Sequence, residues 1–580
     1  TTIDRIIFLR ICEDRGIEAE DALRRATDGK DIYQDLLALF KTADRKYNSG
    51  LFHFSAEKGE PSQADTLTPG LKIDDKVLKD ILAHLYHPSP YAFKYIPADI
   101  LGQVYERFLG KVIRLTSAHQ AKVEEKPEVR KAGGVYYTPT YIVDYIVKNT
   151  LGELIKEETP EKQQMKPLHV LDPACGSGSF LLGAYQYLLD WYLEWYANHE
   201  PTRWTRGKNP AVVETQAGWQ LTMERKKEIL LAHIFGVDID QQAVEVTKLS
   251  LLLKVVENPG QLSLLEERIL PDLGENVKCG NSLIGPDYYT GRQMPMFGDA
   301  ELDRVNPFDW QGAFKQVFAR GGFDAVIGNP PWGAEFSQDE KAYFRKYFEE
   351  IHVRTPESFN YFIGKMTYLG NKDSCIGVII PSSFLNQYEF WKTRKSLIEK
   401  SNILKIVNLG DGVFEHVTAP SCVLIYRKNN LSKPSFFYDY RKFDRALLSN
   451  LLINGSYPNI ISFGNQESDS YSMQYRNAAN VLNKAYKWPS LKIIAEEVAT
   501  GVSSGLDKAF VYSSKDIERL QLEKEIMKKL IIGGEIGRYW LSPVSGKHII
   551  YITPEHKIDK FPFIKSVLIP FKEQLKQRRE

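Results

Sequence analysis

The feature that most constrains the fold of this chain is the alternation of short apolar runs with helical segments between residues 133 and 430. Several of these runs end in Gly, Asp or Asn, as buried strands that lead into loops do. Such alternation is typical of a mostly parallel sheet covered by helices on both faces. The sequence therefore predicts an α/β domain with strands at Leu168–Leu171, Ile234–Val237, Ala325–Ile327, Ile376–Ile380, Ile403–Val407 and Val423–Tyr426.

The regions on either side of this domain have different patterns. The N-terminal region carries isoleucines at helical spacing from Ile3 to Ile11, which indicates a helical domain. The C-terminal region is richer in Tyr, Lys and Ser, which indicates mixed α+β structure. We predict a helical domain at 1–130, an α/β domain at 131–430 and a third domain at 431–580. Because the chain starts without Met and ends in a charged, helix-like run, we expect both ends to be cut near a domain boundary.

Composition excludes several classes of protein. Apolar residues make up 43% of the chain and charged residues 26%, which excludes a mainly disordered protein. No apolar run approaches the ~18 residues of a membrane-spanning helix, so we expect no membrane partner. The five cysteines lie far apart without a CxxC pair. This disfavours a disulfide scaffold and a cysteine-based zinc site, and it indicates a cytoplasmic protein with no metal centre.

The net charge of +1 comes from two unlike parts of the chain. Residues 431–580 hold 23 Lys and Arg against 16 Asp and Glu, a net of +7, whereas the first 430 residues have a net of −6. The net charge of the whole chain by itself argues mildly against a nucleic-acid partner, because proteins that bind nucleic acids usually carry excess basic charge. The uneven distribution instead predicts that any nucleic-acid contact lies in the C-terminal part.

A glycine loop follows the first predicted strand of the α/β domain. The segment HVLDPACGSGSFLLGAY leads from the strand through Asp172 to a loop with Gly176 and Gly178, and then into a helix. Glycines let the backbone approach a ligand closely, and amides at a helix N-terminus favour an electron-rich ligand. A dinucleotide fingerprint would need a third glycine where Leu181 stands, so a nicotinamide or flavin enzyme is disfavoured. A glycine-rich turn without a ligand remains the alternative.

The next acidic residue at a strand end is Asp238, in the segment IFGVDID. From this position a carboxylate can accept hydrogen bonds from ribose hydroxyls. It can equally be the N-cap of the following helix. The sequence leaves both roles open.

The segment FDAVIGNPPWG places Asn329, Pro330, Pro331 and Trp332 directly after a predicted strand. The prolines fix φ and lack an N–H, so the turn presents carbonyl groups and the Asn side chain without competing donors. The Asn329 oxygen and the Pro330 carbonyl can accept both hydrogens of an exocyclic amine while Trp332 stacks on its ring. A turn with no ligand is the plainer alternative, because Asn-Pro often starts turns.

Together these motifs resemble the gamma class of N6-adenine DNA methyltransferases, in the branch found in type IIG restriction–modification enzymes. The resemblance covers roughly residues 131–428, with the glycine loop first, the Asn-Pro-Pro-Trp motif later and the specificity region last. It implies a Rossmann-like catalytic domain, S-adenosyl-L-methionine (AdoMet) as methyl donor, and double-stranded DNA as partner. It also implies a target adenine that is flipped out of the duplex.

The same resemblance assigns roles to individual residues. Thr138, in GGVYYTPTYIVDYIV, corresponds to a position that holds the methionine end of AdoMet, and Asp238 to the ribose-binding acid. Ile239 corresponds to the residue beside the cofactor adenine. The segment KCGNSLIG corresponds to the next motif, with Asn281 and Ser282 as its matching residues. The family often has Asp at the position of Asn281. Phe414, in DGVFEHV, corresponds to an aromatic that would enclose the target base with Trp332. The cofactor loop itself corresponds to Asp172, Pro173, Ala174, Cys175, Gly176 and Gly178.

The residues favour direct methyl transfer to N6 of adenine. Methylation of cytosine at C5 needs an activated cysteine, and none of the five lies near the Asn-Pro-Pro-Trp segment in sequence. Cytosine N4 methylation uses a similar site, but its enzymes more often have Ser in place of Asn. We therefore predict a site-specific adenine methyltransferase. The alternatives are a type I-like modification subunit that needs a separate specificity chain, and a DNA-binding module without catalysis.

The flanking regions also resemble parts of type IIG enzymes. Segments Phe8–Glu18 and Leu101–Gly110 resemble the helical connector that follows an N-terminal nuclease. The only Glu-x-Lys in the first 130 residues, Glu124 to Lys126, lies in a charged stretch and indicates a linker, so any nuclease would lie upstream of Thr1. Segments Gly501–Tyr512 and Ile531–Trp540 resemble the start of a target-recognition domain, where we expect phosphate contacts.

Overall fold

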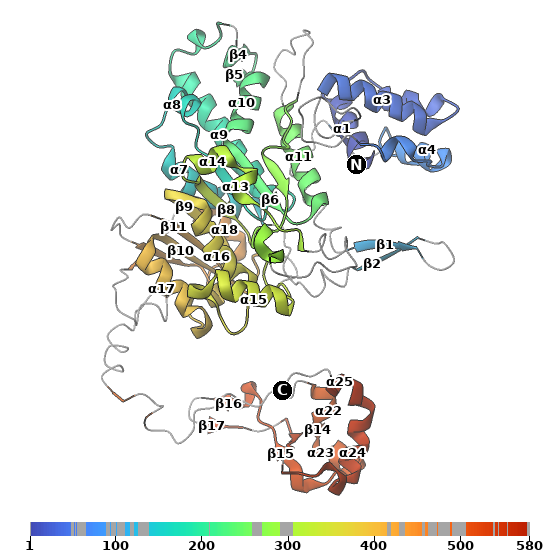
Figure 1. The fold of residues 1–580 in the computed structure, drawn as a ribbon, viewed down its shortest axis with the longest axis vertical. Helices are drawn as coiled ribbons and strands as arrows, with labels where there is room; N and C mark the ends of the chain where they lie inside the picture. Colours follow the sequence, from blue (N-terminus) through green and yellow to red (C-terminus); the bar gives the residue numbers. More distant parts are fainter. Residues whose placement is uncertain are drawn as a thin grey trace. The chain divides into compact units, whose positions relative to one another are not determined.

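The structure is a computed structural model (Figure 1), and contacts divide it into two units, Thr1–Tyr475 and Arg476–Glu580. It describes residues 2–47, 65–88, 138–257 except 208, 270–290, 305–414, 419–428, 435–454, 506–537, 540–542, 545–553 and 555–576, with the positions 52, 54, 93, 100, 473, 488, 489 and 493. For 111–115, 121–125 and 459–461 it describes the backbone alone. None of the helices within these ranges is long and apolar enough to cross a membrane.

The first unit is built on a nine-stranded sheet with the order β13-β12-β10-β11-β9-β8-β3-β6-β7. From β7 to β9 the strands are parallel, whereas β11 is antiparallel to both β9 and β10. All six predicted strands are present. The strands are β3 (Val170–Asp172), β6 (Ile234–Asp238), β7 (Val277–Cys279), β8 (Phe323–Gly328), β9 (Gly370–Pro381), β10 (Asn402–Gly410), β11 (Ser421–Arg427), β12 (Ser435–Asp439) and β13 (Asn459–Ile461).

Helices cover both faces of this sheet, as β9 shows. A Cβ on Gly377 would lie 2.5 Å from Thr150 of α7, whereas Tyr426, the cross-strand partner of Ile376, bonds to Thr367 of α16 at 2.8 Å. Because successive strand residues point to opposite faces, α7 and α16 lie on opposite sides. This arrangement confirms the predicted α/β fold. The α-helices are α7 (Thr140–Leu154), α8 (Pro160–Met165), α9 (Ser179–Asn198), α10 (Met223–His233), α11 (Gln241–Val255), α13 (Trp310–Ala313), α14 (Lys315–Ala319), α15 (Gln338–Tyr347), α16 (Ser358–Leu369), α17 (Trp391–Lys400) and α18 (Arg445–Asn454).

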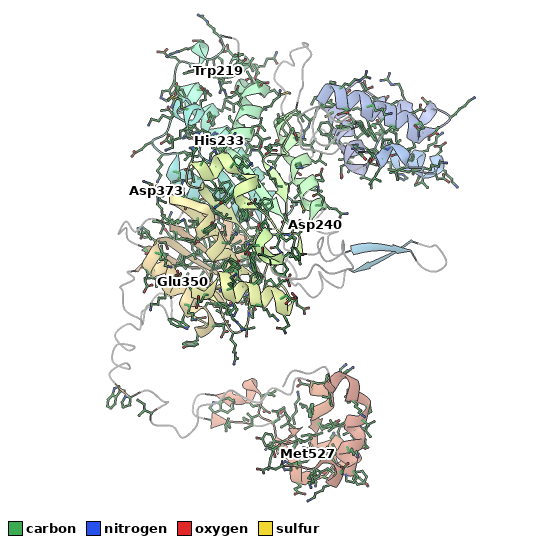
Figure 2. The ribbon with its side chains drawn as sticks, viewed as in Figure 1. Trp219, His233, Asp240, Glu350, Asp373 and Met527 are labelled. Atoms are coloured by element: carbon green, nitrogen blue, oxygen red, sulfur yellow. The ribbon has the colours of Figure 1, made fainter. Side chains whose placement is uncertain are left out.

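A small hairpin of β4 (Val212–Thr215) and β5 (Gly218–Leu221) interrupts the fold between α9 and α10. Trp219, labelled in Figure 2, belongs to this hairpin, and Trp204, which precedes the hairpin in sequence, packs against Tyr196 of α9 at 5.1 Å between ring centroids. Trp204 therefore attaches this segment to α9. The segment between α9 and α10 is thus an added structural element beside α9.

The N-terminal region is helical where the sequence predicts helices, with α1 (Thr2–Asp14), α2 (Ala22–Arg25), α3 (Ile32–Tyr47) and α4 (Asp75–Ala83). Arg15, just after α1, donates a hydrogen bond to the Leu253 carbonyl of α11 at 3.0 Å, which ties these helices to the sheet unit. An antiparallel hairpin, β1 (Lys111–Leu115) with β2 (Ala121–Glu125), departs from the expected helix and linker. Both strands carry β-branched residues, which favour extended backbone. The connector-like segment at 101–110 lies outside the described residues.

The sheet continues past the domain boundary expected at residue 430. β12 pairs in parallel with β10, from Lys405 opposite Phe436 to Asn408 opposite Asp439, and Tyr440 N donates to the Asn408 carbonyl at 2.9 Å. The backbone of the strand SFFYD supplies hydrogen-bond partners for the amides and carbonyls at the edge of β10. The division by contacts accordingly falls after Tyr475, and the assignment of the three regions to connector, methyltransferase and recognition domains stays a prediction.

The second unit has the mixed structure expected of the C-terminal region. Its three-stranded sheet contains β14 (Val511–Ser513), β18 (Lys547–Ile550) and β15 (Met527–Lys529), with α22 (Asp507–Phe510), α23 (Ser514–Arg519), α24 (Pro562–Leu568) and α25 (Lys572–Lys576). A separate pair, β16 (Ile536–Gly537) with β17 (Trp540–Leu541), lies outside that sheet. A small core forms around Ile517, Ile526, Ile550, Phe561 and Ile564. Of the two recognition-like segments, residues 501–505, 538 and 539 lie outside the described residues.

Candidate active site

The candidate residues meet at the carboxyl edge of the parallel half of the sheet. β3 ends at Asp172, β6 at Asp238 and β8 at Gly328. The sheet order places β3 between β6 and β8, and all three strands are parallel. The loops that follow them therefore lie side by side. This edge is where open α/β sheets bind ligands.

The glycine loop after β3 has a backbone that only glycine adopts readily. Gly176 and Gly178 have φ values of +51° and +89°. A Cβ on Gly178 would lie 2.8 Å from the side chain of Thr247 in α11, and the Thr247 hydroxyl donates to the Gly176 carbonyl at 2.8 Å. The loop also donates from Gly176 N to the Asp238 carboxylate at 2.8 Å. The glycines therefore hold the loop against β6 and α11.

One buried and one partly buried carboxyl group lie beside this loop. Asp172 is 1% exposed and accepts a hydrogen bond from Ala174 N at 3.0 Å, while burial raises its pKa to about 8. Burial also raises the pKa of Asp238 to about 6, against the opposing effect of N–H bonds from Asp240 and Gly176. The charge of Asp238 raises the pKa of Asp172 further, and the charge of Asp240 raises that of Asp238, since like charges oppose ionisation.

The structure excludes one of the two roles that the sequence leaves open for Asp238. The N-cap of α11 is Asp240, labelled in Figure 2, whose side chain accepts from Gln242 N at 2.9 Å. Asp238 instead accepts from Asp240 N at 2.9 Å and faces the glycine loop. Ile239, between the two acids, is 50% exposed and lies at the rim of the site. Asp238 is therefore free of the capping role.

The loop after β7 joins the cofactor loop. Ser282 is buried and its hydroxyl donates to the Pro173 carbonyl at 2.5 Å. The side-chain oxygen of Asn281 accepts from Leu283 N at 3.0 Å, so it caps its own turn. Cys175 is buried, and a Cβ on Gly236 would lie 3.1 Å from its sulfur. Burial raises the pKa of this thiol well above its usual value, which fits packing rather than nucleophilic chemistry.

The Asn-Pro-Pro-Trp turn lies directly against the same loop. Gly328, with φ +154°, is so close to the acid of β3 that a Cβ would lie 2.6 Å from the Asp172 carboxyl oxygen. The Asn329 side-chain nitrogen donates to the Thr138 hydroxyl at 3.1 Å, across 191 residues of sequence. Thr138 is 2% exposed and precedes α7. The structure thus brings together the leading motif, the glycine loop and the turn.

Trp332 and Phe414 are buried neighbours. Their ring centroids are 5.2 Å apart and their planes lie at 89°, an edge-to-face contact. A base enclosed between two rings needs parallel faces roughly 7 Å apart, twice a van der Waals contact. The two aromatics expected to enclose a base therefore touch each other in this structure.

Two contacts of the site come from residues that sequence reasoning missed. Thr247 supports the glycine loop from α11, and Ser358 donates from its hydroxyl to the Pro331 carbonyl at 2.5 Å. Ser358 begins α16 after Thr355-Pro356, a pattern that marks a helix start but no function. Thr247 has no local signal. In the described ranges no group of three or more His, Cys, Asp or Glu side chains could hold a metal ion.

Comparison with known proteins gives the family of this site. Residues 232–414 match the model of the Eco57I restriction-modification methylases, and residues 97–272 match that of the N-6 DNA methylases. The chain therefore contains N6-adenine DNA methyltransferase domains. The matched residues include Asp172, Asp238 and the Asn-Pro-Pro-Trp turn.

Individual relatives agree with this assignment. The chain is 30% identical to the type II restriction enzyme and methyltransferase RM.Eco57I of Escherichia coli over 463 residues, which are 77% of this chain and 42% of that protein. It is 23% identical to RM.MjaORFECS2P of Methanocaldococcus jannaschii over 602 residues, covering 73% of this chain and 48% of the relative. The chain therefore spans less than half the length of these two curated relatives.

The fold is shared with a solved restriction–modification enzyme. The type IIL enzyme MmeI, solved in complex with DNA, matches 98% of this chain and 70% of its own chain, with a TM-score of 0.59 and 14% identity. At this identity the likeness concerns the fold. It supports the order of the elements described above.

Proposed function

We propose that the chain is a site-specific DNA methyltransferase that transfers a methyl group from AdoMet to N6 of an adenine. One observation carries the proposal: the Asn-Pro-Pro-Trp turn lies against the glycine loop, with Gly328 packed on Asp172 and Asn329 bonded to Thr138. A methyl donor held by that loop and an amine held by that turn are adjacent. Adjacent, oriented reactants are the main requirement of a direct group transfer.

The residues of the loop fit AdoMet. The backbone cradle at Gly178 has no room for a side chain, and the Asp238 carboxylate is available to ribose hydroxyls because Asp240 caps α11. The exposed Ile239 side chain offers an apolar surface for a purine ring. We infer that Asn281 bonds the cofactor adenine and that Thr138 holds the methionine end. When bound, AdoMet supplies an electrophilic methyl group. Ser282 braces the loop through Pro173.

The turn binds the target amine. The Asn329 side-chain oxygen and the Pro330 carbonyl accept the two N6 hydrogens, which favours the tetrahedral nitrogen that forms as it attacks. Trp332 and Phe414 must part from their edge-to-face contact to admit the base. Base–aromatic stacking is worth ~1–3 kcal/mol per base and offsets part of the cost of flipping, a few kcal/mol.

The C-terminal part holds the DNA. Residues 431–580 carry a net charge of +7, which suits contacts to phosphates before base edges are read. MmeI was solved in complex with DNA, and RM.Eco57I is named a restriction enzyme and methyltransferase. We infer a type IIG arrangement, with this methyltransferase as the modification part of a cytoplasmic enzyme and any nuclease upstream of Thr1.

The proposal is tested by methyl transfer from labelled AdoMet to genomic DNA that lacks N6-methyladenine, followed by digestion to nucleosides. We expect N6-methyldeoxyadenosine as the labelled product. Labelled N4-methylcytosine would contradict the choice of base, and AdoMet binding without any incorporation would favour a DNA-binding module without catalysis. Incorporation that starts only when a separate specificity protein is added would favour the type I-like alternative.

A further inference from the structure

The Asn-Pro-Pro-Trp turn cannot hold its own shape by backbone hydrogen bonds. Pro330 and Pro331 have no N–H, so two consecutive donors are missing. The turn nevertheless has to keep a side-chain oxygen and a carbonyl in register with an amine. Groups outside the turn must therefore fix it.

Ser358 supplies such a contact. Its hydroxyl donates to the Pro331 carbonyl at 2.5 Å, and the residue is 1% exposed. A serine near a helix start usually bonds to the backbone of its own helix. Ser358 instead makes its bond to a residue 27 positions earlier in the sequence. A carbonyl oxygen can only accept a hydrogen bond, so the Ser358 hydroxyl is the donor.

The start of α16 is itself held rigidly. Asn360 is fully buried, donates to the Ile351 carbonyl at 2.9 Å and accepts from the Thr393 hydroxyl at 2.7 Å. Glu357 directly precedes Ser358. Burial raises the pKa of the Glu357 carboxyl group, and a hydrogen bond from the backbone N–H of Gly333 lowers it. This hydrogen bond places the carboxyl group beside the end of the turn. A fixed helix start therefore faces the turn from Pro331 to Gly333.

The bond from Ser358 also distinguishes the two proline carbonyls. In the described part of the chain, no hydrogen bond ends on the Pro330 carbonyl, whereas the Pro331 carbonyl is occupied. We propose that Ser358 is a positioning residue, which fixes Pro331 so that Pro330 remains the carbonyl that accepts from the target amine. This proposal rests on the proposed function, and it assigns the reaction a residue that lies outside every motif.

The test compares Ser358→Ala with Ser435→Ala. Ser435 is also buried and its hydroxyl donates to the Ile403 carbonyl at 2.6 Å, so both variants lose a buried serine-to-carbonyl bond. We expect Ser358→Ala to lower kcat for DNA methylation by about 10- to 100-fold, with the Kd for AdoMet within about twofold of wild type. Ser435→Ala should leave kcat within about twofold, and Ser358→Thr, which keeps the hydroxyl, should recover part of the loss. Equal kcat for Ser358→Ala and wild type would overturn the proposal.

A second readout does not depend on activity. In chains labelled with fluorotryptophan, the fluorine resonance that disappears in Trp332→Phe reports on the turn. We expect this resonance to shift in Ser358→Ala and to stay in place in Ser435→Ala. An unchanged resonance would overturn the positioning role even in an inactive chain, whereas a shifted resonance in a chain that never methylates DNA would contradict the proposed function alone.

Discussion

The carboxyl edge of the sheet and the C-terminal unit stabilise their surfaces in different ways. At the edge, side chains distant in sequence bond to backbone groups of the loops, as Thr247 does to Gly176 and Ser282 to Pro173. In the C-terminal unit, Ile536, Trp540 and Leu541 are 59%, 57% and 59% exposed. Catalysis needs groups in fixed positions, whereas a surface that binds a large partner can keep apolar side chains exposed to solvent. Substitutions at the edge should therefore change catalysis or cofactor affinity, and substitutions in the C-terminal unit should change DNA affinity.

The largest effect is expected for Asn329→Ala. It removes one of the two acceptors for the N6 amine, and loss of one such transition-state hydrogen bond lowers kcat by about 10²- to 10³-fold. AdoMet binding measured by calorimetry should stay within about threefold, because the substitution leaves the glycine loop intact. Asn371→Ala is the control, since Asn371 bonds to Asp324 at 2.7 Å, away from the edge. A variant that methylates adenine at the wild-type rate would show that Asn329 has no such role.

The second effect concerns the backbone cradle. Gly178→Ala should weaken AdoMet binding by about tenfold or more, because its φ of +89° is strained for Ala and the new Cβ meets Thr247 at 2.8 Å. Gly218→Ala is the matched control: φ is +105°, but nothing lies within 4 Å of the added Cβ. The control should lower Tm while the Kd for AdoMet is unchanged. If both variants bind AdoMet as wild type does, the loop does not hold the cofactor.

The third prediction follows from the buried acid of β3. Burial raises the pKa of Asp172 from its usual 3.8 to about 8 in the folded chain, so folding favours the protonated form. The stability that this gives is fully present below about pH 4 and is lost as pH rises towards 8. Asp172→Asn should remove that part of the pH dependence, so its Tm should exceed that of wild type most at pH 8.

The control for Asp172 is Asp373→Asn, at an exposed position labelled in Figure 2. Its Tm should follow that of wild type across the same pH range. A parallel pH profile for Asp172→Asn and wild type would mean that Asp172 is ionised in the folded chain. These measurements need no cofactor, so they test the electrostatics of the edge separately from catalysis.

Sequence alone predicts most of the sheet and the motifs, because these depend on local pattern. The apolar runs of β8 and β9 are continuous, as strands buried on both faces require. The sequence does not predict β7, because its three residues, VKC, are too few to show a pattern. It assigns β12 to another domain, because the partner of a strand is not encoded locally. Local pattern also left Asp238 ambiguous until Asp240 proved to cap α11.

The remaining parts of the site depend on long-range contacts. Thr138 meets Asn329 across 191 residues, and Thr247 meets Gly176 across 71. Ser358 has a local sequence that indicates only the start of a helix. A single sequence names the groups that a reaction needs, but it does not reveal which hydroxyl groups hold them, because those pairings form only when the chain folds.

The smallest effect is expected in the C-terminal unit. Lys528 and Lys529 of β15 are exposed in the part of the chain with a net charge of +7, and each Lys→Gln that removes a phosphate contact should reduce the slope of log Kd against log salt by about one. DNA affinity at fixed salt should fall while kcat at saturating DNA stays at the wild-type value. Lys30→Gln, at an exposed position of the N-terminal helices, is the control and should leave the slope unchanged. If kcat falls instead of affinity, the C-terminal unit takes part in catalysis, and the contrast between the two regions does not hold.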